Sequence, residues 1–158
     1  MEPEPEPIYG SEVSNQVEAA CLHKAENAIL ESAKINPRGR LMVVADTLVE
    51  DPDDSKLPLG KPTGHLKAAG MLIRLSGRRH RVWSSTAIAY PPDFVLKGED
   101  GDSVYFIKGW AVELWTDFSI VEFEDLGEGG VVTLVNSGSW LVKEGGSELA
   151  GEACAVAN

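Results

Sequence analysis

A nearly apolar run of nine residues, LMVVADTLV at positions 41–49, constrains this chain more than any other feature. Gly39 precedes the run and an Asp-Pro pair follows it, so the pattern predicts a central strand buried on both faces. Asp46 lies near the predicted C-terminal end of that strand. A buried carboxylate is costly unless it is engaged, and ligands of open α/β sheets bind beyond the carboxyl ends of strands. We therefore predict Asp46 to be a site carboxylate, with a turn cap shared with Thr47 as the alternative.

The residues that follow this run predict a connection, an anion-binding position and a helix. Residues 50–58 are strongly acidic and predict a solvated loop. A Gly-Lys-Pro triplet centred on Lys61 then precedes a helix with Thr63 as its N-cap. The core-facing positions of this helix are predicted to be Leu66, Ala69 and Ile73. A lysine just before a helix N-terminus is well placed for an anion, although the P-loop spacing is absent.

The rest of the chain predicts further helices and strands. Residues 14–33 have helical spacing, and Lys24 lies on or beside the apolar stripe, where it either extends to water or points into a site. Strands are predicted over residues 82–90, 104–107 and 110–123, the last two forming an antiparallel hairpin that turns near Gly109. Residues 126–142 fit a strand or a helix. The two cysteines, Cys21 and Cys154, are far apart and are predicted to be reduced thiols.

Charge is distributed unevenly along the 158 residues. The net charge is -11, yet residues 37–97 carry six acids and ten bases, which makes that segment +4. An acidic protein is poorly suited to general nucleic-acid binding, whereas a local positive cleft can hold a small phosphorylated ligand. The basic cluster at residues 78–81 is interpreted as a solvated surface at a turn, and an RNA-binding module built on it is the minor alternative.

The N-terminus and the hydropathy pattern give expectations about domains and location. Residues 1–12 alternate Glu and Pro and predict a flexible tail, followed by a single domain over residues 13–158. No stretch resembles a signal peptide or approaches the length of a membrane-spanning helix. We therefore expect a cytoplasmic protein with no membrane partner.

Several short motifs occur in a fixed order over residues 14–151. They are KAENAI from Lys24, VVADTLV from Val43, GKP at Gly60, MLIRLSGRRH from Met71, and later SIVEF and SGSW, followed by Ala150-Gly151. In this order the chain resembles the Maf family of nucleoside triphosphate pyrophosphatases, although the family's S-x-S-P-R-R loop and its C-terminal end have no match here. The resemblance implies a mixed α/β fold, with an elongated twisted mixed sheet and flanking helices around a central cleft.

The resemblance also implies a reaction and a set of site residues. The implied reaction is hydrolysis of a nucleoside triphosphate between its α and β phosphates with a divalent cation, usually Mg²⁺. The ADT motif resembles the branch that acts on dTTP and UTP, whereas the branch that prefers 7-methyl-GTP carries a glutamine in place of this threonine. The implied roles are proton acceptor and metal contact for Asp46, phosphate-binding lysines for Lys24 and Lys61, and base selection for Thr47. His80 matches the histidine of LSGxxH and is a candidate for substrate binding or for a structural role.

Two alternatives follow from the unmatched motifs. The first is a catalytically impaired Maf-like protein that binds a nucleotide or a protein partner, because the arginine-rich loop is not matched. The second concerns assembly. A sheet without its first strand would expose an edge, and such an edge would favour a homodimer.

Overall fold

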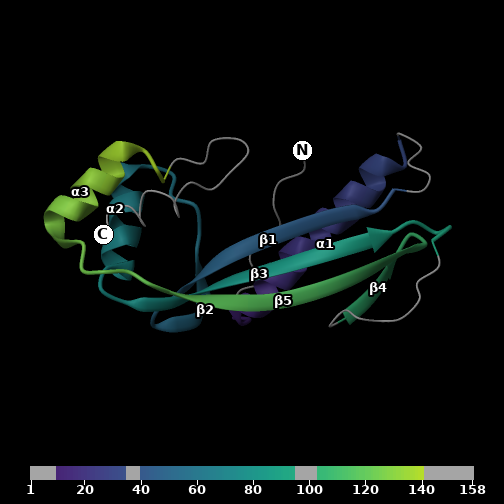
Figure 1. Ribbon diagram of the computed structural model, residues 1–158, viewed down its shortest axis with the longest axis horizontal. Helices are drawn as coiled ribbons and strands as arrows, with labels where there is room; N and C mark the ends of the chain where they lie inside the picture. Colours follow the sequence, from purple (N-terminus) through teal and green to yellow (C-terminus); the bar gives the residue numbers. More distant parts are fainter. Residues whose placement is uncertain (1–9, 35–39, 95–102, 141–158) are drawn as a thin grey trace. The chain divides into compact units, whose positions relative to one another are not determined.

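The computed structural model describes residues 10–34, 40–94 and 103–140 (Figure 1). Its elements are α1 (Val13–Ser32), β1 (Met42–Asp51), β2 (Asp54–Leu59), α2 (His65–Leu75), β3 (Arg79–Tyr90), β4 (Ser103–Ile107), β5 (Trp110–Glu122) and α3 (Gly127–Ser137). Most of the predicted tail and Cys154 lie outside the described residues. The predicted helix over residues 14–33 and the three strands from residue 82 onward are confirmed, with small shifts at their ends.

The five strands form one sheet in the order β2-β1-β3-β5-β4, and with the helices they give the mixed α/β fold that the family resemblance implies. Strands β4 and β5 pair antiparallel, with Ile107 opposite Trp110. Lys108 and Gly109 form the two-residue turn between them and have positive φ angles of 48° and 83°. Turns of this kind match the right-handed twist of the flanking strands. The predicted hairpin at Gly109 is therefore confirmed.

The acidic segment after β1 forms a hairpin with β1, so the predicted loop over residues 50–58 is wrong. β1 continues to Asp51, and β2 returns antiparallel beside it, with Val49 opposite Leu59 and Asp51 opposite Asp54. Asp, Lys and Pro are depleted in strands, which is why composition alone favoured a loop. Backbone pairing with β1 overrides that preference.

Burial along β1 alternates, so the prediction that both of its faces are buried is also wrong. Val43 is 66% exposed, whereas its neighbours Met42 and Val44 are half-buried and pack against the core. Alternate side chains of a strand point to opposite faces. The same strand places Asp46 in its middle, five residues before the end at Asp51, and not at its C-terminal end as predicted.

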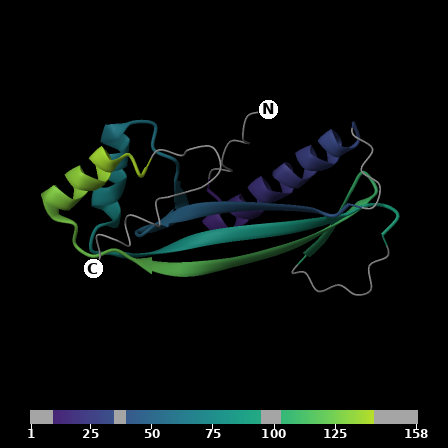
Figure 2. The same ribbon diagram turned by 45° about the horizontal axis from the view of Figure 1, so that its top comes forward.

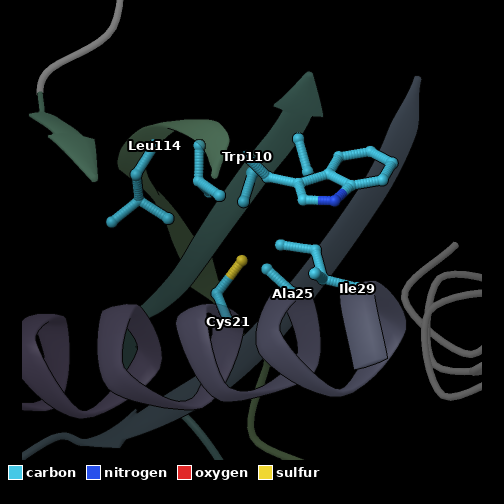
Figure 3. Packing of buried hydrophobic residues seen from close by; sticks show 8 residues of the cluster. Cys21, Ala25, Ile29, Trp110 and Leu114 are labelled. Carbon is cyan, nitrogen blue, oxygen red and sulfur yellow. The ribbon is translucent and has the colours of Figure 1, made fainter. Parts of the chain in front are cut away.

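The chain divides into two compact units, and the first comprises residues 1–48 and 82–119. Within it α1 lies along one face of the strands (Figure 2). Side chains from α1, β3 and β5 form its core (Figure 3): Cys21, Ala25, Ile29, Ala87, Ala89, Trp110, Val112 and Leu114. Burial raises the pKa of the Cys21 thiol, which is free, as predicted. The predicted single domain over residues 13–158 stays a prediction.

The second unit comprises residues 49–81 and 120–158, and in it α2 packs against α3. Its core consists of Ala68, Leu72, Val131, Leu134, Val135 and Trp140. The predicted core face of α2 is wrong at Leu66, which is 90% exposed, and at Ile73, which is 65% exposed; Ala69 does pack against this core. Thr63 is not the N-cap, because the helix begins after Gly64. The ambiguous segment over residues 126–142 contains helix α3, which ends at Gly138 in the left-handed conformation.

Candidate functional site

Lys24 and Asp46, two of the predicted site residues, form an ion pair in the first unit. Lys24 on α1 donates from Nζ to Oδ1 of Asp46 on β1 at 2.8 Å. The Asp46 side chain is 18% exposed and that of Lys24 is 39% exposed, so water reaches the pair. Strand periodicity explains why Asp46 lies beside Lys24. Val44 and Asp46 point to the same face of β1, and Val44 packs against the core that α1 covers. Lys24 thus reaches a carboxylate in place of extending only to water.

The two oxygens of the Asp46 carboxylate have different surroundings. Oδ1 accepts both the Lys24 ammonium and, at 3.0 Å, the backbone N–H of Thr47. Within the described ranges of the chain, no hydrogen bond reaches Oδ2. The carboxylate is therefore oriented through one oxygen, and the other can accept a proton or contact a cation.

Thr47 follows Asp46 in the strand and points to the opposite face of β1. Its Oγ1 lies 3.0 Å from Oγ of Ser84 on β3, and both residues are exposed. Sequence reasoning missed Ser84, because one serine within VWSSTAIAY gives no signal until the register of β1 and β3 is known. The role of Thr47 in base selection stays a prediction.

Lys61 lies in the second unit, at a hollow of about 370 Å³ between the end of β2 and α2. Two further cations line this hollow, Lys67 and Arg74. Its apolar lining comes from Leu57, Pro58, Leu59, Pro62 and Met71. Neither Lys61 nor Lys67 forms an ion pair with any residue that the structure describes. We call this feature the β2–α2 hollow.

His80 lines a different hollow of the second unit, of about 420 Å³, together with Glu50, Asp51, Arg79 and Arg81. The imidazole is 6% exposed and packs at a tilt against Phe123, with ring centroids 5.5 Å apart. Burial lowers the pKa of His80, so the ring is neutral at pH 7. Its Nδ1 has no partner among the residues described. The structure thus places Lys61 and His80 at separate hollows, and the role of His80 stays a prediction.

The basic cluster at residues 78–81 does more than form a solvated turn. Three of its residues begin β3, and its arginines pair with acids of the second unit. Arg78 pairs with Asp53, Arg79 with Glu122 at 2.8 Å, and Arg81 with Glu50 at 3.8 Å. This pairing offsets much of the positive charge on which an RNA-binding module would depend.

Asp51 is the buried carboxylate of the second unit, and Arg74 of α2 holds it. Arg74 Nη2 donates to Asp51 Oδ1 at 2.8 Å, and Arg74 Nε donates to Oδ2. The Asp51 side chain is fully buried. Hydrogen bonds from Arg74 lower the pKa of Asp51 despite the opposing effect of burial. The pair ties the β1–β2 hairpin to α2, which is also what positions the wall of the β2–α2 hollow.

We predict that this pair makes the protein sensitive to acid. A carboxylate with a lowered folded-state pKa stabilises the fold above its unfolded pKa, about 3.9 for Asp, and that stabilisation is lost as the pH falls through the lower folded value. The free energy of unfolding should therefore fall more steeply below pH 4 in the wild type than in Arg74→Gln. Urea midpoints from circular dichroism between pH 6 and pH 3 measure this. Arg79→Gln, which removes an exposed pair, should keep the wild-type slope, and equal slopes in wild type and Arg74→Gln would contradict the prediction.

The described residues suit a divalent cation that the substrate helps to hold, not one bound by a cluster of protein ligands alone. Over residues 10–34, 40–94 and 103–140, no three His, Cys, Asp or Glu side chains group so as to hold a metal ion. Mg²⁺, however, is often bound through one or two carboxylates together with substrate phosphates and waters. Asp46, with Oδ2 open, fits a site of that kind.

Over the same described residues, no helix has the length and apolar character needed to cross a membrane.

Comparison with protein families assigns the chain. The family model described as Maf-like protein matches residues 2–157, nearly the whole sequence, and its range includes Lys24, Asp46 and Lys61. Comparison with curated proteins yielded no match. Members of this family are generally nucleotide pyrophosphatases that depend on a divalent cation. The chain therefore belongs to the family of Maf-like proteins, as the order of its motifs predicts.

Proposed function

We propose that this chain is a nucleoside triphosphate pyrophosphatase of the cytoplasm, which hydrolyses dTTP or UTP to the monophosphate and pyrophosphate with Mg²⁺. The observation that carries the proposal is the ion pair between Lys24 and Asp46. Attack on a phosphoanhydride needs a water, a group that orients or deprotonates it, and positive charge near the developing oxyanions. The pair supplies a proton acceptor and a cation side by side in a position that water reaches.

The proposal gives separate roles to the two carboxylate oxygens of Asp46 and to the ammonium of Lys24. The N–H of Thr47 and the ammonium of Lys24 hold Oδ1 of Asp46, so Oδ2 has a fixed direction in which to accept a proton from the attacking water. A lysine has three donors, and Lys24 uses one on Asp46, which leaves donors for phosphate oxygens. When bound, Mg²⁺ supplies further positive charge to the phosphates, and Asp46 is the residue that would hold it.

Lys61 and Thr47 are further residues that we predict to bind the substrate. Lys61 lines a hollow free of acidic side chains, which favours phosphate binding. Thr47 and Ser84 present two hydroxyl groups on the face of the sheet opposite Asp46, so the proposed role of Thr47 in base selection rests on the family resemblance.

A panel of triphosphates tests the proposal. We expect pyrophosphate release with Mg²⁺ from dTTP and UTP, at a kcat/KM about tenfold above that for 7-methyl-GTP, since hydrogen bonds to the base discriminate between substrates. CTP completes the panel. The measurement is released pyrophosphate against time. If no triphosphate is turned over, the proposed activity is excluded.

The second candidate is a Maf-like protein that binds a nucleotide or a protein without catalysis. Calorimetric binding of dTTP with no release of pyrophosphate would favour this candidate, and sustained turnover would exclude it. Whether the protein acts as a homodimer stays a prediction, and sedimentation equilibrium would measure it.

A further inference from the structure

We propose that Phe118, supported by Trp83, stacks against the base of a bound nucleotide. Trp83 lies on β3 and Phe118 on β5, both within the first unit, and we call them the Trp83–Phe118 pair. Their ring centroids are 4.8 Å apart and their planes are tilted by 49°. The ligand class rests on the proposed function, since it takes a nucleotide to be the substrate. The placement of the two rings is independent of that function.

The Trp83–Phe118 pair lies on the same face of the sheet as Asp46, which is the face that α1 covers. Alternate residues of a strand point to one face. On β5, Phe118 comes four residues after Leu114, which lies in the core beneath α1. On β3, Trp83 comes four residues before Ala87, which lies in the same core. Both rings therefore point to the side of the sheet on which the Asp46 carboxylate lies.

The register of β1 and β3, which are neighbours in the sheet (Figure 1), brings Trp83 close to Asp46. Two contacts define this register: Thr47 Oγ1 with Ser84 Oγ at 3.0 Å, and Glu50 with Arg81 at 3.8 Å. The contacts advance in opposite directions along the two strands, so β1 and β3 are antiparallel and Asp46 lies opposite Ser85. Trp83 is two residues from Ser85 on the same face, a rise of about 7 Å.

The exposure of the pair suits a ligand that stacks. Phe118 is 42% exposed, whereas Leu114 on the same face is 2% exposed, so the covered part of the core ends before Phe118. Trp83 is half-buried and contacts Phe118 from the neighbouring strand. This contact restricts the rotamers of Phe118, so less conformational entropy is lost when a ligand binds the ring.

A nucleobase matches both the rings and their position. Stacking on an aromatic side chain contributes to the binding of every base, because each base has a π-face. The proposed reaction cleaves the bond between the α and β phosphates, and a single ribose joins the α phosphate to the base. A base on the Trp83–Phe118 pair and phosphates beside Asp46 and Lys24 can therefore belong to one bound molecule.

Calorimetric titration of dTMP into the full chain tests this pair without turnover, because a monophosphate has no phosphoanhydride bond to cleave. Phe118→Ala should weaken dTMP binding about tenfold, which is typical for the loss of one base–aromatic stack. Phe118→Tyr keeps the ring and should bind dTMP as the wild type does. The affinity of Phe118→Ala for CMP should fall by a similar factor, because stacking depends little on the identity of the base.

Phe94→Ala is the matched control. Phe94 also belongs to the first unit, is 48% exposed and stacks on Tyr90, with ring centroids 5.1 Å apart. Tyr90 lies five residues along β3 from Ser85, in the direction away from Trp83. Removal of this exposed ring should leave the affinity for dTMP unchanged. Inorganic pyrophosphate has no base, so its binding isotherm should be the same for the wild type and for Phe118→Ala.

The outcomes separate base stacking from the proposed activity. Weaker dTMP binding in Phe118→Ala, with Phe118→Tyr, Phe94→Ala and the pyrophosphate isotherm unchanged, supports stacking whether or not any triphosphate is hydrolysed. Stacking is overturned, even if dTTP is hydrolysed, when the wild type binds no dTMP, when Phe118→Ala binds it normally, or when Phe94→Ala loses as much affinity. Circular dichroism of each variant confirms that it is folded before binding is compared.

Discussion

Asp46→Asn is expected to lower kcat for dTTP hydrolysis by about a thousandfold, because a positioned general base contributes roughly 10²- to 10⁴-fold. Asparagine keeps an oxygen that can accept from the Thr47 N–H and from Lys24, so the local geometry at Oδ1 is retained. It cannot accept a proton from water. The effect should therefore appear in kcat, with a smaller change in KM. Steady-state release of pyrophosphate measures both.

Asp117→Asn is the matched control for this variant. Asp117 lies on β5 in the same unit, and its Oδ1 accepts the N–H of the next residue, Phe118, at 2.7 Å. The arrangement is like that of Asp46 and Thr47, but among the residues that the structure describes Asp117 has no lysine partner. We expect Asp117→Asn to retain the wild-type kcat within about twofold, as expected of a surface substitution. If Asp46→Asn also retains it, Asp46 is not the proton acceptor, and the proposed mechanism fails.

Leu114→Ala is expected to destabilise the fold by about 3 kcal/mol, which corresponds to a fall in Tm of about 8 °C. Leu114 is 2% exposed and lies in the core of the first unit with Ile29 and Trp110 (Figure 3). Truncation removes its apolar contacts and leaves a cavity that the surrounding structure closes only in part. Differential scanning calorimetry measures the change.

Leu66→Ala is the control for this experiment and also tests the face of α2. Leu66 is 90% exposed, and alanine is at least as good a helix former, so the expected change in Tm is about zero. A loss of stability equal to that of Leu114→Ala would mean that Leu66 is in a core after all. That result would restore the sequence-based assignment of the helix face and contradict the structure.

The sequence predicted an element correctly where neighbouring residues alone determine its structure. The β4–β5 hairpin was predictable because alternating apolar residues flank Gly109, which a tight turn requires. The core face of α2 was not, because two stripes satisfy helical spacing. Leu66, Ala69 and Ile73 form one, and Ala68, Leu72 and Leu75 form the other. Only contact with α3, more than fifty residues away in sequence, decides between them.

The candidate site shows the same division between local and distant information. Asp46 stood out because a carboxylate interrupts an apolar run. Its pairing with Lys24 depends on how α1 lies on β1, which motif order implied only through family resemblance. The sequence did not predict Ser84 or Lys67. Ser84 lies beside Thr47 because of the register of β1 and β3, and Lys67 lies beside Lys61 because both line one hollow.

The division of the core into two units also has an optical consequence. Of the four tryptophans, Trp83, Trp110 and Trp115 belong to the first unit, and Trp140 alone belongs to the second, where it lies in the core against His65. The intrinsic emission of Trp140→Phe therefore arises from the first unit, and its difference from wild type reports the second. Tryptophan fluorescence of the wild type and of Trp140→Phe can therefore show which unit changes first when a nucleotide is added.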